Sequence, residues 1–404
     1  MKKALSIVLT AALAAALLAS CGGKAPSSAA ENSTPTQTPV SSTPAPPPEP
    51  PYTPNPYTGF EKDSSFPEGQ RGVAIMVNNI AVSRPQRGLS MADVLFESKV
   101  EGGITRFMAL FEDYKVLPDV GPVRSARDQF FRLVYPFQPL YVHIGRSGIT
   151  QTYIDTVEYG DLNLDGDHDV ISYRRDRPGY DKEHRSYTNG DLIQKVIDKK
   201  NIDMNRTYNS PLFDFVKYDE NGGERAMGGE PAESVSITHS MSYRTYFDYA
   251  ADGGRYMMSQ YSSSSRSRHK TVDENNGEQL GFENVIVLFA EITTYPYPGG
   301  NLDKNGNDKG DPNYQNVHMD DGGVGYYFSK GKVEEIRWQK GAIENRLWFT
   351  DLDGNDLKIN CGKSYIGMVS LEEHDNGFSY AGPESEIVDS GLPTSEVSEV
   401  EIGD

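Results

Sequence analysis

The chain has 404 residues, of which 58 are acidic and 39 are basic, so its formal net charge at pH 7 is −19. This negative balance argues against nucleic acid as a partner, because nucleic-acid binding relies on Lys and Arg that neutralise phosphates. It also argues against electrostatic attachment to anionic lipid, so a membrane anchor would have to be covalent.

Residues 1–20 have the layout of a secretory signal. Lys2 and Lys3 precede an apolar run over residues 4–19 that lies at the terminus. Small residues then lead to Cys21 as Leu-Ala-Ser-Cys, which resembles a bacterial lipobox with lipid on the cysteine sulfur. We therefore expect a lipoprotein signal peptide over 1–20 and a chain anchored through Cys21 to the extracytoplasmic face of the cell membrane. The alternative is a simple signal peptide cleaved near residue 19 or 20.

Residues 21–59 are predicted to form a disordered tether. They are rich in Pro, Ser and Thr and contain almost no large aliphatic side chains, so they cannot bury a core. Such a segment would hold the folded body away from the membrane. With Cys21 acylated, Cys361 has no partner for an intrachain disulfide. Four aromatic side chains near the end of the tether are expected to dock onto the body: Tyr52, Tyr57, Phe60 and Phe66.

We predict that an N-terminal mixed α/β domain occupies residues 60–216. It opens with a strand at 73–77 that is apolar on both faces. The stretch 94–111 consists of two alternating runs around Gly102-Gly103, which is typical of a β-hairpin.

A two-residue loop at the hairpin tip fixes which side chains share a face. Arg106 would then lie opposite Lys99 and diagonal to Glu97 and Glu101, within reach of long side chains. One face of the hairpin would carry a polar island, and the other would be apolar. A register slip of one residue would exchange the two faces.

The next element is predicted to be a helix that starts at Pro122, because Pro suits the first helical position and apolar residues follow at a 3–4 spacing. Arg124 and Arg127 would then stand in its first turns, where positive charge is unfavourable. One interpretation is an anion site made by the helix start, Arg124, Ser125 and Arg127. The other is internal pairing of these arginines with Glu97, Glu101 or Asp93.

A short strand over residues 140–144 brings His143 and Ser147 to one end. They could act as base and nucleophile, although the spacing differs from the Gly-x-Ser-x-Gly elbow. The alternative is a structural histidine. Farther on, Asn189 is expected to cap a helix over 191–199.

Two polar segments lie between these elements. The first imitates the start of a calcium loop, but Ser172 stands at the twelfth position, where a bidentate Glu is needed. Its candidate ligands are Asp161, Asn163, Asp165 and Asp167, with Asp-rich turns as the alternative. The second segment is a basic, aromatic loop containing His184 and Tyr187, which would line the cleft at Arg124 or remain a solvated loop. The sequence has no phosphate-binding loop, dinucleotide fingerprint or zinc spacing, so no cofactor is expected.

A Gly-rich, charged stretch at 219–231 is the predicted domain boundary. A smaller β-rich domain would follow at 232–370, with a long strand at 283–293, hairpins around 329–332 and 353–354, and a last strand at 363–370. Residues 371–404 contain ten acidic residues and no Lys or Arg, which is typical of a solvated acidic tail.

Several strings resemble the YerB-like family of bacterial lipoproteins. They include "SRPQRGLSMADVLFESKVEGGITRFMALFE", "GPVRSARDQFFRL" and "GFENVIVLF", and the match extends over roughly 70–370. The resemblance implies a lipoprotein with two domains, and it implies no chemistry because both domains of the family are of unknown function. The chain departs from the family pattern at 183–185, where Glu-His-Arg replaces Pro-His-Asn.

Together these features predict an α+β fold and a non-catalytic extracytoplasmic lipoprotein that binds an anionic cell-envelope component, such as a cell-wall polymer, or an envelope protein. The alternative is a cell-wall hydrolase or transferase that uses His143 or a Glu as base. The candidate ligand-binding residues are Glu97, Glu101, Arg106, Arg124, Ser125, Arg127, His143, Ser147, His184 and Tyr187.

Overall fold

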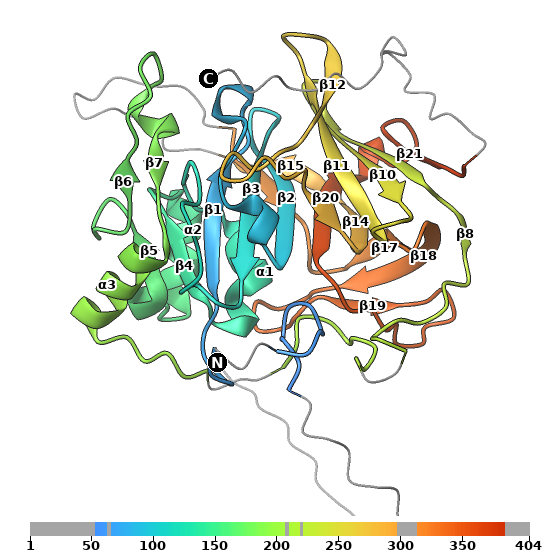
Figure 1. The fold of residues 1–404 in the computed structure, drawn as a ribbon, viewed down its shortest axis with the longest axis horizontal. Coiled ribbons are helices and arrows are strands. Elements are labelled where there is room, and N and C mark those ends of the chain that lie inside the picture. Colours follow the sequence, from blue (N-terminus) through green and yellow to red (C-terminus); the bar gives the residue numbers. More distant parts are fainter. Residues whose placement is uncertain (1–52, 63–65, 207–209, 219–220, 297–312, 384–404) are drawn as a thin grey trace, which may run out of the picture. The chain divides into compact units, whose positions relative to one another are not determined.

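The computed structural model describes residues 53–383 except 63–65, 207–209, 219–220 and 297–312, and its largest element is an 11-stranded sheet (Figure 1). The predicted signal peptide, Cys21 and most of the tether lie outside these residues. One half of the sheet comes from early strands, namely β1 (Val73–Asn78), β2 (Val94–Glu101), β3 (Ile104–Phe111), β4 (Leu140–His143) and β5 (Asn163–Asp165). The other half comes from β8 (Glu230–Pro231), β14 (Asn284–Ala290), β17 (Gly323–Ser329), β18 (Lys332–Gln339), β19 (Trp348–Thr350) and β20 (Ser364–Ser370).

The two halves join through a parallel pair in the middle of the sheet. The strand order is β19-β18-β17-β14-β20-β2-β3-β1-β4-β5, so β20 lies directly beside β2. β20 also runs parallel to β14, and all seven of its residues are buried. Parallel strands are covered on both faces, which explains why these segments are continuous apolar runs in the sequence.

A second sheet of six strands covers part of the large one. It contains β9 (Ser234–Ser240), β10 (Tyr243–Ala250), β11 (Arg255–Ser262), β12 (Ser267–Lys270), β13 (Gly281–Phe282) and β21 (Phe378–Ala381). Two small pairs complete the strands: β6 (Tyr173–Arg174) with β7 (Ser186–Tyr187), and β15 (Ile292–Thr294) with β16 (Gln315–Val317).

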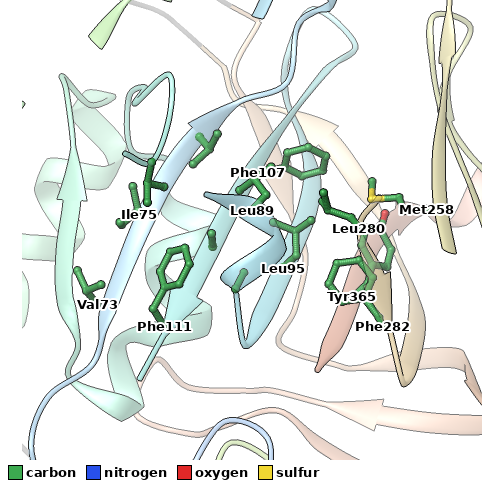
Figure 2. Packing of buried hydrophobic residues seen from close by; sticks show 14 of the residues in the cluster. Val73, Ile75, Leu89, Leu95, Phe107, Phe111, Met258, Leu280, Phe282 and Tyr365 are labelled. Atoms are coloured by element: carbon green, nitrogen blue, oxygen red, sulfur yellow. The ribbon is translucent and has the colours of Figure 1, made fainter. Parts of the chain in front are cut away.

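Hydrophobic residues fill both faces of the large sheet. On one face, Leu95 and Phe107 of the hairpin share a cluster with Met258 and Phe282 of the second sheet (Figure 2). On the other face, Val94, Phe96 and Met108 pack with residues of a short helix, α1 (Asp128–Val134). The odd and even positions of β2 therefore serve different cores, as the alternation of side chains along a strand requires.

The fold is richer in sheet than the predicted α+β class with a mixed α/β N-terminal domain, and that prediction needs correction. The described residues contain three α-helices, α1 (Asp128–Val134), α2 (Gly148–Thr156) and α3 (Gly190–Lys200). None is longer than 11 residues. The predicted helix at 191–199 is confirmed as α3, and its cap is the predicted one, because Asn189 Oδ1 accepts a hydrogen bond from Leu192 N at 3.0 Å. No helix in the described part of the chain combines the length and apolarity that crossing a membrane needs.

The predicted hairpin is confirmed, but its predicted register is wrong. Ser98, rather than Lys99, lies opposite Arg106, and the register shifts between Lys99 and Glu101. A β-bulge near the turn leaves Val100 unpaired and moves every pair behind it by one residue. As a result Glu97 and Arg106 point to opposite faces of the sheet.

The predicted start of the helix after Gly121 is also wrong. Residues 120–126 are extended and form bridges to β1 and to other segments, with Val77 opposite Val123. Helix α1 begins only at Asp128, and Arg127 is its N-cap residue in an extended conformation. Arg124 therefore has no helix dipole to oppose, because it lies outside the helix.

Two predictions about the ends of the body have different outcomes. Aromatic residues near the end of the predicted tether do dock, since Tyr57 and Phe66 are buried in the two cores, and Tyr52 lies outside the described residues. The segment after residue 370 is more than a solvated tail. It contains β21, which pairs antiparallel with β9, and the ring centroids of Phe378 and Phe289 lie 5.2 Å apart.

Truncation tests the role of β21. We expect a chain ending at Ser370 to lose about 2–4 kcal/mol of unfolding free energy, because Phe378 and Tyr380 would no longer pack and β9 would become an open edge. A chain ending at Pro383 keeps β21 and serves as the control. Urea denaturation of both chains measures the difference, and equal stabilities would show that β21 contributes nothing.

Candidate functional site

The candidate site lies where the extended segment before α1 crosses the carboxyl ends of two parallel strands. Arg124 N donates to Met76 O of β1 at 2.9 Å, and Ile144 N, just after β4, donates to Arg124 O at 3.1 Å. In open sheets with parallel strands, ligands bind beyond the carboxyl ends of those strands. The backbone thus places Arg124 and its neighbours at an edge suited to a ligand.

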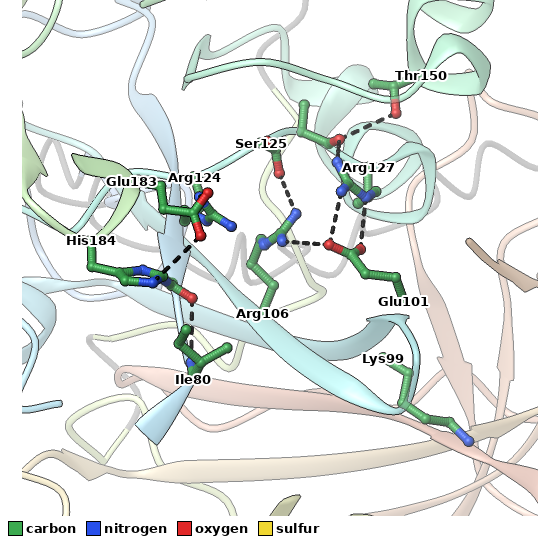
Figure 3. Close-up of polar contacts among 12 residues, drawn as sticks. Ile80, Lys99, Glu101, Arg106, Arg124, Ser125, Arg127, Thr150, Glu183 and His184 are labelled. Atoms are coloured by element: carbon green, nitrogen blue, oxygen red, sulfur yellow. Dashed lines mark hydrogen bonds and ion pairs between the residues drawn. The ribbon is translucent and has the colours of Figure 1, made fainter. Parts of the chain in front are cut away.

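Glu101 holds two arginines at this edge (Figure 3). Arg127 binds it through two nitrogens, with Nε to Oε2 at 3.0 Å and Nη2 to Oε1 at 2.9 Å. Arg106 Nη2 donates to the same Oε1 at 2.9 Å, and its Nη1 donates to the carbonyl oxygen of Ser125 at 2.8 Å. Ser125 therefore contributes its backbone to the cluster. Lys99, which the predicted register placed opposite Arg106, points away.

The third arginine is paired more loosely. Arg124 Nη1 lies 3.2 Å from Glu183 Oε2, and the Glu183 side chain is 56% exposed. The other Glu183 oxygen lies 3.5 Å from His184 Nε2. Asn78 Nδ2 contacts His184 Nδ1 at 3.1 Å, which places the imidazole hydrogen on Nε2, facing Glu183. We call Glu101, Arg106, Arg124, Arg127, Glu183 and His184 the arginine cluster.

Positive charge exceeds negative charge in the arginine cluster. Its three arginines face two carboxylates, since burial lowers the pKa of His184 and keeps its imidazole neutral at pH 7. Burial, the nearby charge of Arg127 and that of Arg124 lower the pKa of Arg106 to about 9, although Glu101 opposes them. Burial alone would raise the pKa of Glu101, but Arg106 and Arg127 outweigh it and lower that pKa. In the described part of the chain, Arg106 Nε and Arg124 Nε are buried without a hydrogen-bond partner.

Glu97 lies on the opposite face of the hairpin, away from the arginine cluster. Asn79 Nδ2 and Thr105 Oγ1 donate to its Oε1 at 3.0 and 2.7 Å. Thr245 Oγ1 and Tyr365 Oη donate to its Oε2 at 2.8 and 2.7 Å. Burial would raise the pKa of Glu97, but the charge of His239 and these hydrogen bonds lower it to about 2. Of the three acids predicted as possible internal partners of the arginines, Glu97 is therefore wrong, whereas Glu101 does pair with Arg127.

His143 and Ser147 have structural partners. His143 is fully buried, with Nδ1 3.0 Å from Gly145 O and Nε2 2.7 Å from Asn163 Oδ1. Burial lowers the pKa of His143 and keeps its imidazole uncharged at pH 7. Ser147 caps α2, where its Oγ accepts from Thr150 N at 3.1 Å. With both ring nitrogens engaged, His143 offers no free nitrogen to act as a base.

The remaining predicted residues do not join the arginine cluster. The buried Tyr187 hydroxyl accepts from Arg177 Nη1 at 3.2 Å. Asp165 accepts from the backbone of Gly145 and Asp167 and binds Arg146. Within the described residues, no group of three His, Cys, Asp or Glu side chains is arranged so that it could hold a metal ion. Calcium binding at Asp161, Asn163, Asp165 and Asp167 stays a prediction.

Sequence reasoning missed Glu183 as the partner of Arg124. The sequence contains only a charged loop residue beside His184, and 59 positions separate Glu183 from Arg124. It likewise missed Asn79 and Tyr365 as partners of Glu97. The residues that donate hydrogen bonds to a buried carboxylate come from distant parts of the chain, so no local sequence pattern identifies them.

Replacing Glu101 tests how strongly the arginine cluster depends on its inner carboxylate. We expect Glu101→Gln to lower the unfolding free energy by about 3 kcal/mol, because Arg106 and Arg127 would be left buried without their shared anion. Glu183→Gln is the matched control and should cost less than about 1 kcal/mol, since its ion pair is exposed. Equal losses in denaturant unfolding would contradict this distinction.

Acid unfolding tests Glu97. Its folded pKa lies below the ordinary value of 4.5, so its stabilisation is present above pH 4.5 and disappears as the pH falls towards 2. We expect the wild-type chain to lose roughly 3 kcal/mol more than Glu97→Gln between pH 4.5 and pH 2. Parallel stability profiles of the two proteins would mean that Glu97 has an ordinary pKa.

Comparison with known proteins follows the same two-part plan. Residues 57–203 match the family model described as the protein of unknown function (DUF3048) N-terminal domain, and residues 235–366 match the DUF3048 C-terminal domain. A Bacillus subtilis protein described as "Putative lipoprotein YerB" is 28% identical over 324 residues, which cover 78% of this chain and 85% of the relative. The crystal structure of the Bacillus subtilis YerB protein is similar, with a TM-score of 0.60 and 27% identity over 78% of this chain and 96% of that one. The chain therefore belongs to the DUF3048 family, of which YerB is a relative.

Proposed function

We propose that the protein is a lipid-anchored extracytoplasmic binding protein that uses the arginine cluster to bind an anionic component of the cell envelope. The observation that carries the proposal is the imbalance of charge, because three arginines share one partly buried carboxylate and one mostly exposed carboxylate. The chain as a whole has a net charge of −19, so this cluster is a positively charged region on an acidic protein. Such a region would attract an anion.

Arg124 is the residue that would meet the ligand. Its side chain is 21% exposed, whereas those of Arg106 and Arg127 are 2% and 7% exposed. Glu183 acts in this proposal as a replaceable counter-ion, because an exposed ion pair contributes little stability. An incoming phosphate or carboxylate would take the place of Glu183 and bind the guanidinium of Arg124 through two hydrogen bonds.

The two more deeply buried arginines would preorganise the site. Arg106 and Arg127 are fixed by Glu101, so they lose little conformational freedom when a ligand binds. Their positive charges lie deeper than Arg124 and would attract the anionic ligand. Burial, and after it the charge of Arg127, lower the pKa of Arg106, so an anion bound nearby would stabilise its positive charge.

The proposed location at the membrane rests on Cys21 and on the lipoprotein relative. The Leu-Ala-Ser-Cys string would supply the lipid attachment site, and residues 21–59 would supply the tether. The description of the Bacillus subtilis relative as a lipoprotein supports the same anchoring. A tethered body could then reach a cell-wall polymer or an envelope protein while remaining attached to the membrane.

Binding measurements with purified cell-wall fragments and with inorganic phosphate test the proposal. We expect Arg124→Gln to weaken binding at least tenfold while the protein stays folded, and Glu183→Gln to strengthen it, because the competing carboxylate is removed. Binding should also weaken as salt rises. Arg337→Gln is the control, since Arg337 forms an exposed pair with Glu335.

Two results would contradict the proposal. One is a folded Arg124→Gln protein that binds as the wild type does. The other is release of products from the cell wall by the wild type, which would favour the enzyme alternative.

A further inference from the structure

We propose that the protein has a second ligand site, a small pocket that takes a hydroxylated carboxylate about the size of one sugar-acid ring. The pocket has a volume of about 180 Å³ and lies between the loop that follows β1 and the strands β11 and β12. It is separate from the arginine cluster. Thr105 contacts Asn79, which lies behind the pocket, whereas Arg106 belongs to the cluster. These two residues follow each other in β3, so their side chains point to opposite faces of the sheet.

The floor of the pocket consists of two buried amides with fixed orientations. Gln86 and Gln260 are 1% and 3% exposed, and both donate through Nε2 to Asn79 Oδ1, at 3.2 and 3.1 Å. Asn79 cannot turn its amide over, because its Nδ2 lies between Glu97 Oε1 and Thr105 Oγ1 at 3.0 and 2.8 Å. Glu97 is thus a positioning residue, since it orients Asn79 and, through it, the two glutamines.

This orientation leaves acceptor atoms without donors. Because Gln260 Nε2 is directed at Asn79, its Oε1 faces the other way, and that oxygen is buried with no hydrogen-bond partner among the described residues. Thr271 Oγ1 is also buried without a hydrogen-bond partner, and Thr271 is 6% exposed. Buried polar atoms in folded proteins nearly always have partners. Both residues line the pocket, and the two oxygens are covered by neighbouring atoms. A ligand whose entry parts those atoms would satisfy both oxygens with its hydroxyl groups.

The charges around the pocket select an anion. Two cations, Arg84 and Lys270, line it, and none of the residues that line it is Asp or Glu. Three of the five N–H groups of Arg84 donate to Asn79 Oδ1, Asn79 O and Tyr261 O. Arg84 has two further N–H groups, and in this proposal they bind the carboxylate of the ligand.

The size of the pocket limits the ligand. Sites for drug-sized molecules usually enclose 300–1,000 Å³, so about 180 Å³ suits a smaller molecule such as a single ring. A carboxylate would pair with Arg84 and Lys270, and hydroxyl groups would donate to Gln260 and Thr271. A uronic acid combines both groups on one ring.

Calorimetric titration of the full-length protein with D-glucuronate tests the inference. We expect saturable binding with a dissociation constant below about 10 mM. Glucose, which lacks the carboxylate, and cyclohexanecarboxylate, which lacks the hydroxyl groups, should each bind at least tenfold more weakly.

Variants locate the ligand. Thr271→Val keeps the side-chain shape but removes the unpartnered oxygen, so it should weaken glucuronate binding at least threefold, and Arg84→Gln should weaken it at least tenfold. Thr293→Val is the matched control on an exposed strand. If Arg84→Gln is unfolded, Thr271→Val alone decides the result.

Three outcomes would overturn the inference. The first is no glucuronate binding at millimolar concentration, and the second is unchanged binding by a folded Thr271→Val protein. The third is loss of binding by Arg124→Gln, which would place the ligand at the arginine cluster. Conversely, if Arg124→Gln fails to bind wall fragments but still binds glucuronate, both sites stand.

Discussion

The carboxylate of Glu97 is the point at which the two halves of the chain are held to each other. It lies on β2, the strand that joins the halves through β20, and it accepts hydrogen bonds from Thr105 on one side and from Thr245 and Tyr365 on the other. A buried charge without partners would cost far more than folding can supply. The donors from the second half must therefore be in place for β2 to keep a charge at this position.

The β-bulge in the β2–β3 hairpin determines which residues can act together. It moves the pairing by one residue, so Glu97 faces the second sheet while Arg106 faces α1. One hairpin thereby supports two polar regions on its two faces. The arginine cluster has an excess of positive charge, and the pocket beside Arg84 has amide and hydroxyl oxygens without donors. Both features are suited to anions, and they differ because only the pocket offers acceptors for hydroxyl groups.

The arginines that precede α1 owe their position to backbone pairing. Arg124 is held between Met76 and Ile144 in an extended segment, so the sheet edge places it where a ligand could approach. Its partner Glu183 comes from a distant loop and is mostly exposed. An ion pair whose carboxylate is mostly exposed is a weak interaction, whereas Glu101 holds two arginines that are themselves buried.

The sequence by itself determined the elements whose evidence is local. The hairpin around Gly102-Gly103, the buried strands β1, β14 and β20, and the cap of α3 by Asn189 could all be predicted, because turn residues, apolar runs and capping side chains act within a few positions.

Only the tertiary structure decided which of those residues meet. The bulge at Val100 depends on how both faces of the hairpin pack, and no local pattern specifies it. The extended form of residues 120–126 follows from bridges to β1 and to other distant segments, which overrode a helical spacing of apolar residues. Glu97 and Tyr365 are 268 positions apart, and Glu183 reaches Arg124 from another loop. The first contact arises because β20 pairs with β2 inside the large sheet, and the second because a distant loop folds over the segment before α1. The sequence therefore supplies the charged residues, and the fold decides which of them pair.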